Sequence, residues 1–422
     1  MIEDADGMAT SERSGMPGLR QQSVRDVRLF NLKFSPNLGD GLLSIALEQA
    51  LAEHGFHGES TYSVDLAART GFGPGAASRS LLLRAIDGMP PGIRQSALKI
   101  PLAAMTRLRW RPHYVAALSD AQAAIIGGGN LFADMDLNFP TKLSAVIGLA
   151  AERKLPTAIY GVGVSGDWSA SGLRMVRQAL AKADLRYVSV RDVASKDQFD
   201  ALFADVTGRS ADVVRDPGIL ISRYVPALEP AQLRGAIGLC ITSPIAVRYH
   251  STMKPTDDEL ASWYAELCRE LRREERPLVV FTNGSPEDEL FLDRISHGLQ
   301  ASAGAGYTRR RVRTPIELAL LVSEFAVLVA HRMHALIAGC SYGVPLVALR
   351  WDRKVDSFMD SIGAADRVLA AESGTVGMAA SMVGELLAAT PSNATPSARI
   401  IEEAFEGVGR LAEALSDTGP PQ

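Results

Sequence analysis

The sequence of 422 residues lacks the features that define several protein classes. Its three cysteines, Cys240, Cys268 and Cys340, lie far apart, which predicts a reducing compartment and no disulfide framework. No CxxC motif or Cys/His cluster indicates structural zinc, and we expect no metal site. No run of about 20 apolar residues occurs, so we expect no transmembrane segment.

Neither sign of charge dominates the chain. Lysine and arginine number 44, aspartate and glutamate 48, and the net charge of -4 gives no reason to expect nucleic acid as a partner. Residues 1–23 are polar and have no apolar core segment, so we expect a disordered tail rather than a secretory signal. We expect a cytoplasmic protein. Peripheral contact with the inner face of the plasma membrane stays open, although no amphipathic basic helix stands out to hold the protein there.

Short apolar segments alternate with amphipathic helical patterns almost throughout the chain. Strands are predicted at residues 27–33, 123–129, 157–164, 187–192, 212–220, 235–241, 277–283, 325–330 and 344–350. The alternation predicts an α/β protein with two doubly wound, Rossmann-like domains facing a cleft. We expect an N-terminal α/β domain over 24–224 and a C-terminal α/β domain over 233–417. Within the first, residues 66–115 form an irregular insertion that is a candidate wall of an acceptor site.

The segment His331-Arg332-Met333-His334 lies where a buried strand meets an apolar helix. Free N–H groups and the helix dipole make a helix start a site for anions, and Arg332 adds a positive fork suited to carboxylate or phosphate. His334 can exchange a proton near neutral pH. This pattern favours a substrate that is anionic and requires protonation. For His331, a role in packing or capping is an equally good interpretation.

Two further basic residues follow predicted strands. Arg191 ends the strand at 187–192, where it is either a second anion-binding residue or part of a surface ion pair. Lys354 lies just beyond the strand at 344–350, where it either adds charge against a phosphate or pairs with Asp356. Asp192 and Ser195, which begin the next helix, are candidates for helix caps.

Glycine-rich turns follow several of the strands. Gly161, Gly163 and Gly166 match G-x-G-x-x-G, but the helix starts only after Trp168, so the match is weak evidence for a dinucleotide. We interpret these turns, including Gly128, as places where a ligand approaches the backbone. Four polar side chains beside these turns could face that ligand: Asn37, Asp40, Asn130 and Asp134. Helix capping is the alternative for each, and for Asp40 it is the better interpretation.

The segments "NLGDGLLSIAL", "AIIGGGNLFAD", "VSVRDVASKDQF" and "HRMHALIAGCSYGVPLVALRWDRKVDSF" occur in an order that resembles the polysaccharide pyruvyl transferase family, from about residue 30 to residue 363. The resemblance implies a GT-B-like architecture. It also implies transfer of pyruvate from phosphoenolpyruvate to two hydroxyls of a sugar in an exopolysaccharide or its lipid-linked precursor, forming a ketal and releasing phosphate. The family's donor-binding arginine falls on Arg191, its arginine–x–histidine motif on Arg332, Met333 and His334, and His334 is the presumed catalytic residue. No cofactor besides the co-substrate phosphoenolpyruvate is implied.

Two alternative functions remain open at this point. A GT-B sugar-nucleotide glycosyltransferase would require acidic residues near a ribose, for which Glu317 and Glu324 are the candidates. An inactive relative could instead act as a scaffold of a polysaccharide assembly complex. Binding of a sugar nucleotide, or of no donor at all, would distinguish these functions from pyruvyl transfer.

Overall fold

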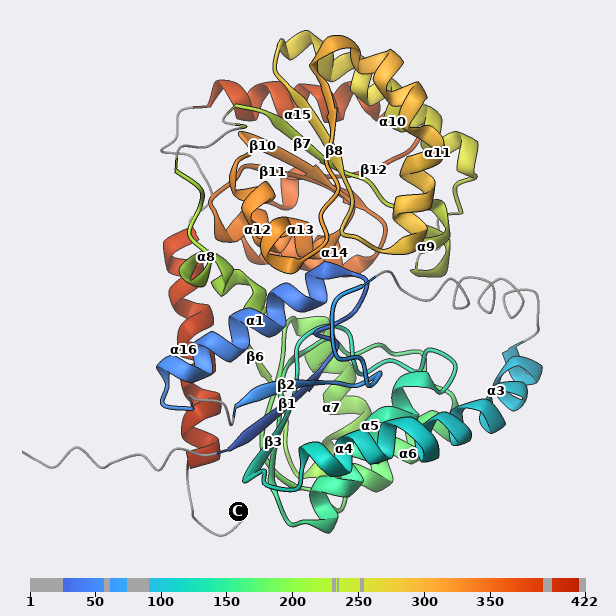
Figure 1. Ribbon diagram of the computed structural model, residues 1–422, viewed down its shortest axis with the longest axis vertical. Helices are drawn as coiled ribbons and strands as arrows, with labels where there is room; N and C mark the ends of the chain where they lie inside the picture. The colour runs from blue at the N-terminus through green and yellow to red at the C-terminus, as the bar shows by residue number, and fades with distance from the viewer. Residues whose placement is uncertain are drawn as a thin grey trace, which may run out of the picture.

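The protein consists of two α/β halves, each built on a six-stranded sheet (Figure 1). The computed structural model describes residues 26–56, 61–73, 91–229, 233, 235–250, 254–389 and 397–416. All neighbouring strands run parallel in both sheets. The predicted class, with two doubly wound halves, is therefore confirmed.

The first sheet has the strand order β2–β1–β3–β4–β5–β6 and the second β12–β11–β10–β7–β8–β9. The strands of the first sheet are β1 (Val27–Asn31), β2 (Tyr62–Asp65), β3 (Ala123–Gly127), β4 (Pro156–Val162), β5 (Asp184–Val190) and β6 (Asp212–Val213). Those of the second are β7 (Ile237–Cys240), β8 (Leu278–Phe281), β9 (Tyr307–Arg309), β10 (Val327–Ala330), β11 (Leu346–Arg350) and β12 (Val368–Ala370). Every residue of β1, β3, β7, β8 and β10 is buried, since helices cover both faces of a parallel sheet.

Helices connect successive strands in both halves. The first half contains α1 (Leu38–Glu53), α3 (Pro91–Met105), the π-helical η1 (Thr106–Trp110), α4 (Arg111–Ala117), α5 (Asn138–Glu152), α6 (Ala170–Leu180), α7 (Val193–Thr207), η2 (Pro217–Leu220) and α8 (Ile221–Tyr224). Then follow α9 (Pro244–His250), α10 (Asp257–Leu271), η3 (Arg272–Glu274), α11 (Pro286–Ala303), η4 (Gly304–Gly306), α12 (Pro315–Ser323), α13 (Met333–Ser341), α14 (Arg353–Ser361), η5 (Ala365–Arg367), α15 (Val376–Ala388) and α16 (Ser397–Ser416).

The winding direction reverses once in each sheet, between β1 and β3 and between β7 and β10. In doubly wound folds, ligands bind beyond the carboxyl ends of the strands at such a point. The strand ends at these two points lead into α1, into the turn at residues 128–130, and into α13. The fold thus identifies the same chain segments that the polar residues of the sequence indicate.

Helix α1 lies between the two halves (Figure 1). It contacts η2 and α8 on one side and α12 and α13 of the second half on the other. Most of its residues are buried, among them Leu42, Leu43, Ala46, Leu47, Ala50 and Leu51. A helix that is buried around most of its circumference shows little amphipathicity, which explains the strongly apolar sequence after Asp40.

The C-terminal helix α16 returns to the first half of the molecule (Figure 1). The sequence analysis assigned it to a C-terminal domain spanning 233–417, but α16 contacts β4, β5 and α1. Its buried residues recur at helical spacing: Ile400, Ala404, Val408, Leu411 and Leu415. That pattern predicts a helix with one buried face, but it carries no information about which of two sheets the face will meet.

Two of the predicted segments fall wholly or partly outside the described residues. The tail at 1–23 lies entirely outside them, as do residues 74–90 of the predicted insertion at 66–115. The rest of that insertion is more regular than expected, because α3, η1 and α4 follow one another without a break from residue 91 to residue 117.

The packing of α16 on the first sheet can be tested by replacing Leu411. We expect Leu411→Ala to lower the free energy of unfolding by about 2–5 kcal/mol, because its side chain is fully buried. Hydrogen exchange should quicken in β4 and β5 more than in β11. The control Leu290→Ala removes a side chain that is 60% exposed and should change stability by less than about 0.5 kcal/mol. Faster exchange in β11 alone would contradict the assignment.

Candidate functional site

The site lies where the N-terminal ends of α1 and α13 meet across the two halves. A methyl group placed on Gly39 would lie 2.2 Å from Cβ of His334. Only a residue without a side chain allows the two helix starts to come this close. The contact brings together residues that are about 300 positions apart in the sequence.

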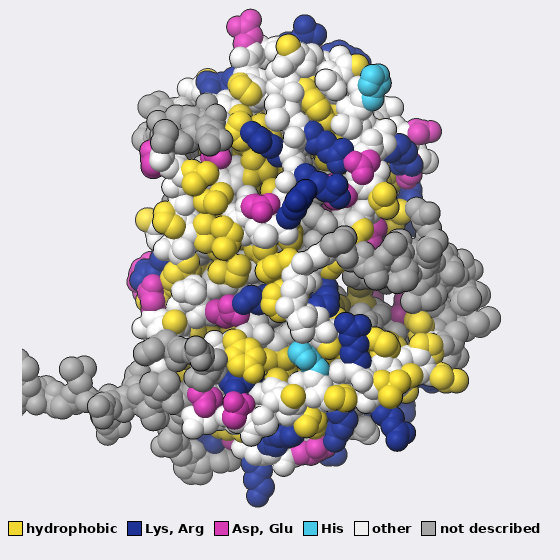
Figure 2. All heavy atoms as spheres, viewed as in Figure 1, with side chains coloured by type: hydrophobic (Ala, Val, Ile, Leu, Met, Phe, Trp, Pro, Cys, Tyr) yellow, Lys and Arg dark blue, Asp and Glu magenta, His cyan; other side chains and the backbone are white. Residues whose placement is uncertain are grey.

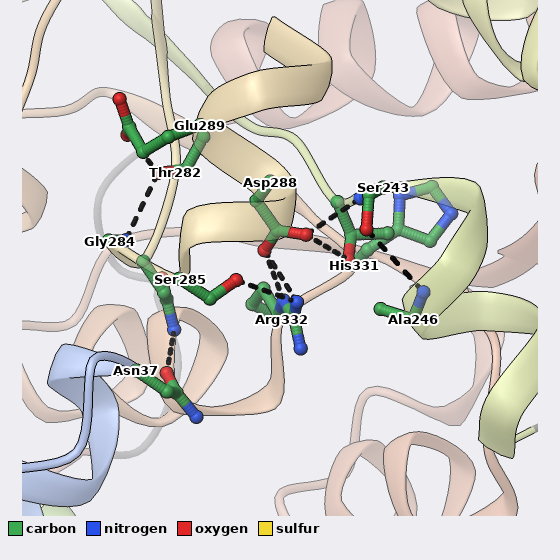
Figure 3. Close-up of polar contacts among 12 residues, drawn as sticks. Asn37, Ser243, Ala246, Thr282, Gly284, Ser285, Asp288, Glu289, His331 and Arg332 are labelled. Atoms are coloured by element: carbon green, nitrogen blue, oxygen red, sulfur yellow. Dashed lines mark hydrogen bonds and ion pairs between the residues drawn. The ribbon is translucent and has the colours of Figure 1, made fainter. Parts of the chain in front are cut away.

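Arg332 is held in place by the second half alone (Figure 3). It is the N-cap residue of α13, and its Nε and Nη2 donate to Oδ2 of Asp288 at 2.7 and 2.5 Å. Nη2 also donates to Ser285 at 3.2 Å. The other oxygen of Asp288 accepts from the N–H of Ser243 at 2.7 Å, so the buried carboxylate is fully engaged. Arg332 therefore presents a preorganised positive charge, and Nη1 takes no part in these bonds.

His331 belongs to the core of the second half. Its side chain is 1% exposed, and Nδ1 lies 2.7 Å from the hydroxyl of Tyr264. Burial, aided by neighbouring Arg332, lowers the pKa of His331 to about 3. Of the two interpretations for this imidazole, the structure supports packing.

His334 is also largely buried, but it differs from His331 in its hydrogen bonding. Its side chain is 11% exposed, and its Nε2 is buried without a hydrogen-bond partner among the described residues. Burial lowers the pKa of His334 to about 3, and the charges of Arg191 and Arg332 contribute to the shift. His334 is therefore neutral at pH 7, and its Nε2 lacks the hydrogen bond that a buried polar atom normally makes.

Asp40 is the acidic neighbour of His334. Its Oδ1 lies 3.8 Å from Nδ1 of His334, and burial raises the pKa of Asp40 to about 6. It does not cap α1, since the side chain of Asn37 accepts from the N–H of Gly39 and fills that role. The capping interpretation of Asp40 is thus wrong.

Arg191 completes the site from the first half. It is 5% exposed, so the alternative of a surface ion pair is wrong. A methyl group on Gly163 would lie 2.6 Å from Oδ1 of Asn130 and 2.8 Å from Nη2 of Arg191, which shows that both side chains lie against this glycine. The nearest carboxylates, Asp192 at 3.6 Å and Asp216 at 3.9 Å, are beyond hydrogen-bond distance.

Buried polar atoms without partners are concentrated here. Within the described part of the chain they include Oδ1 of Asn130, Nε and Nη2 of Arg191, Oδ2 of Asp216 and Nε2 of His334. More than nine in ten buried polar groups normally have a partner. The oxygens of Asn130 and Asp216 are acceptors, whereas the two nitrogens of Arg191 are donors and Nε2 of His334 can be one. Unfulfilled donors beside Arg332 have the character of a binding site for an anion.

Lys354 pairs with a different carboxylate from the one that the sequence suggested. Lys354 is 23% exposed and pairs with Asp352 at 3.2 Å, whereas Asp356 pairs with Arg350. Burial lowers the pKa of Lys354; Asp352 opposes the shift and the nearby Arg191 adds to it.

Two of the predicted site residues serve the fold. The N–H of Gly128 donates to the carbonyl of Tyr160 at 2.9 Å and is not free for a ligand. Met333 begins α13 and packs against the core.

A family model described as "Polysaccharide pyruvyl transferase" matches residues 37–353. This chain belongs to the polysaccharide pyruvyl transferase family. The matched region holds Asp40, Asn130, Arg191, Arg332 and His334, and Lys354 lies one residue beyond it. The family is one of transferases, and its name implies a saccharide acceptor.

Two solved structures with a similar fold are UDP-GlcNAc 2-epimerases. A UDP-GlcNAc 2-epimerase of Methanocaldococcus jannaschii is 9% identical, with a TM-score of 0.52 over 92% of this chain and 98% of that one. UDP-N-acetylglucosamine 2-epimerase of Rickettsia bellii gives 9% identity and a TM-score of 0.55 over 92% and 96%. These likenesses show the GT-B-like fold of this pyruvyl transferase family member. No curated protein matches the chain.

Sequence reasoning missed the partners of the arginines. Asp288 lies in the first turn of α11, just after the carboxyl end of β8, and Asp216 follows β6. Both positions carry the signal that identified Arg191 and Arg332, a charged residue following a strand. The acidic candidates for a ribose, Glu317 and Glu324, accept hydrogen bonds from the N–H groups of Arg313 and Leu233.

The glycine motif does not form a dinucleotide site. Gly161 has φ +58° inside β4, but α6 begins only at Ala170, capped by Ser169. A dinucleotide fingerprint requires its glycines to open a helix directly.

Over the residues that the structure describes, no helix could cross a membrane and no group of three or more potential ligands could hold a metal ion.

The raised pKa of Asp40 makes stability depend on pH. Its folded value of about 6 exceeds the ordinary 3.8, so the folded state binds the proton more tightly and loses stability as pH rises from 4 to above 6. Asp40→Asn should therefore raise the free energy of unfolding at pH 8 by up to about 3 kcal/mol. We expect the gain to vanish below pH 4, measured by melting temperature. The control Asp197→Asn, on the exposed side of α7, should show no such trend.

Proposed function

We propose that this protein transfers pyruvate from phosphoenolpyruvate to two hydroxyls of a sugar, forming a ketal and releasing phosphate. The observation that carries the proposal is the cluster of buried, unpartnered polar atoms on Arg191, Asn130 and His334, beside the preorganised Arg332. Phosphoenolpyruvate carries a carboxylate and a phosphate, and its reaction requires protonation at carbon. Two cations and a proton-exchanging imidazole in one buried site suit that substrate.

The donor would be bound from both halves. Nε and Nη2 of Arg191 supply a free edge of the guanidinium group, and Nη1 of Arg332 supplies another. The N–H groups at the start of α13, around Met333, add the positive end of a helix dipole. Lys354 lies close enough to Arg191 for their charges to interact and would add to the field around a phosphate.

His334 would act as the general acid. Protonation of the methylene carbon of the donor forms a methyl group and places positive charge on the neighbouring carbon. One sugar hydroxyl attacks that carbon and gives its proton to the imidazole of His334, which has just lost one. The bond to phosphate then breaks, the second hydroxyl attacks the same carbon, and the proton of this second hydroxyl leaves with the phosphate. Overall, one proton ends on the methyl group and one on phosphate.

The proton would reach His334 when the donor binds. The charges of Arg191 and Arg332 help to keep the imidazole neutral in the unliganded site. Burial is the larger cause of the low pKa of His334, and an anion bound between the two arginines would offset the contribution of their charges, which moves this pKa upward. Asp40, 3.8 Å away and with a pKa near 6, is placed to deliver that proton or to accept one from an acceptor hydroxyl.

The acceptor would be a sugar of an exopolysaccharide or of its lipid-linked precursor. The reaction as written uses phosphoenolpyruvate as co-substrate and calls for no other cofactor. Since phosphoenolpyruvate is a cytoplasmic metabolite, the reaction would take place in the cytoplasm, with lipid-linked acceptors at the inner face of the plasma membrane.

Two variants separate donor binding from chemistry. Phosphoenolpyruvate should raise the melting temperature of the native protein. Arg332→Lys keeps a charge for Asp288 but loses the guanidinium fork, and we expect donor affinity to fall by about 10- to 100-fold. His334→Ala should keep the thermal shift but release phosphate about 10²- to 10⁴-fold more slowly in the presence of acceptor.

Arg350→Ala serves as the control for both variants, since this arginine is 47% exposed and pairs with Asp356. It should leave the thermal shift and phosphate release unchanged. A shift with sugar nucleotides alone would overturn the proposal in favour of a glycosyltransferase. Full phosphate release by a folded His334→Ala protein would remove the histidine from the mechanism.

Donor binding should be coupled to proton uptake. The pKa of His334 is about 3 before binding, whereas a general acid must hold a proton in the reactive complex, so the proposed mechanism requires the complex to hold more protons than the free protein near pH 7. Calorimetry in buffers of different ionisation enthalpy should therefore report uptake, and affinity should weaken as pH rises. Uptake that persists in Asp40→Asn would assign the proton to His334. Zero uptake or proton release would contradict the coupling.

A further inference from the structure

The two most exposed large apolar side chains of the described residues lie on one continuous helical segment, together with two that are less exposed. Among the described residues, Ile100 is 80% and Leu108 78% exposed, and Met105 and Val115 are 38% and 37% exposed. All four belong to α3, η1 and α4. Single exposed apolar residues are common on any protein, but four within one segment form a patch.

These residues follow the geometry of an amphipathic helix. Ile100, Ala104 and Leu108 are spaced four residues apart, and Pro101 and Met105 run beside them, so the five side chains form one outer stripe. The opposite side holds the segment to the body of the protein. Trp110 and Tyr114 are buried there, and the hydroxyl of Tyr114 donates to the carbonyl of Leu66 at 2.6 Å.

Basic side chains flank the outer stripe. Lys99, Arg107 and Arg109 are all exposed. Arg109 donates to the backbone carbonyl of Ala68, and no ion pair to a described carboxylate is found for Lys99 or Arg107. Figure 1 shows α3 extending outward from the helices around the first sheet, and Figure 2 shows hydrophobic and basic side chains next to one another on that part of the surface.

The sequence around this segment has a charge opposite to that of the chain. Residues 98–119 contain four lysines and arginines (Lys99, Arg107, Arg109 and Arg111) and no acidic residue, for a net charge of +4. The whole chain carries -4, so the remaining residues carry -8. Positive charge is therefore found on the same segment as the exposed apolar side chains.

We propose that the outer stripe docks onto an anionic lipid bilayer, with its apolar side chains among the headgroups and its basic residues against lipid phosphates. A projecting helix with a bare apolar face and flanking arginines has the geometry of an interfacial helix, and its charge is complementary to an anionic leaflet. The sequence alone indicated no such helix, because the stripe becomes visible only once the packed side is known.

Docking would bring a lipid-linked acceptor to the enzyme. In that respect the inference deepens the proposed function, whereas the binding itself rests on the surface alone. Vesicle binding and donor binding are separate measurements. Failure of one therefore leaves the other standing.

The test uses sedimentation of the full chain with vesicles of phosphatidylcholine alone or with about a third phosphatidylglycerol. We expect binding to the anionic vesicles only, and weaker binding at about 0.5 M salt. Ile100→Ser combined with Leu108→Ser should lower the partition coefficient about tenfold or more, and so should Arg107→Gln combined with Arg109→Gln. All variants should keep the thermal shift with phosphoenolpyruvate.

The matched control replaces apolar residues exposed elsewhere. Leu290 and Met378, 60% and 56% exposed, lie on α11 and α15, and their double replacement by serine should leave vesicle binding unchanged. Equal binding to neutral and anionic vesicles, or no binding to either, would overturn the proposal. It would also be overturned if the protein were a dimer by light scattering and the Ile100/Leu108 variant became a monomer, since the stripe would then bind a second copy.

Discussion

The close approach of two helix starts is the constraint on which the site depends. Gly39 lies directly against His334, and any side chain at this position would push α1 away from α13. The approach places Asp40 beside the imidazole and turns the apolar helix α1 into the wall between the halves. Each half contributes one arginine, Arg191 from the first and Arg332 from the second. The site therefore exists only when both sheets are assembled in this arrangement.

The electrostatics of the site are unfavourable in the absence of a ligand. Arg332 is balanced by Asp288, but Arg191 has no carboxylate within hydrogen-bond distance among the described residues, and burial disfavours the charged forms of both Asp40 and His334. Buried polar groups without partners lower the stability of a protein. Such groups persist where they are used, and an anionic donor would supply what Arg191 and His334 lack. The same unpaired groups lower the stability of the unliganded protein and favour the binding of a negatively charged ligand.

The fold by itself would not have led to this function. Its structural neighbours include two UDP-GlcNAc 2-epimerases that are 9% identical and have a similar fold. The proposal of a small anionic donor comes instead from the side chains at the helix start around Arg332, because function depends on the residues placed at the switch points of a fold. The docking proposed for the outer stripe and the basic side chains beside it likewise depends on surface residues and is independent of the sheet order.

The sequence by itself determined the class of fold, the buried central strands and the residues that follow them. Short apolar runs that alternate with helical patterns indicate central strands of a parallel sheet, and charged residues that follow these strands lie at its carboxyl edge. The strands β2, β9 and β12 were missed because they are short edge strands with weak apolar patterns. Only the tertiary structure decided that Asp288 holds Arg332, that Asp40 faces His334 rather than capping α1, and that α16 packs on the first sheet. These are contacts between distant segments, and a local pattern records that a side chain is buried or charged but not which partner it meets.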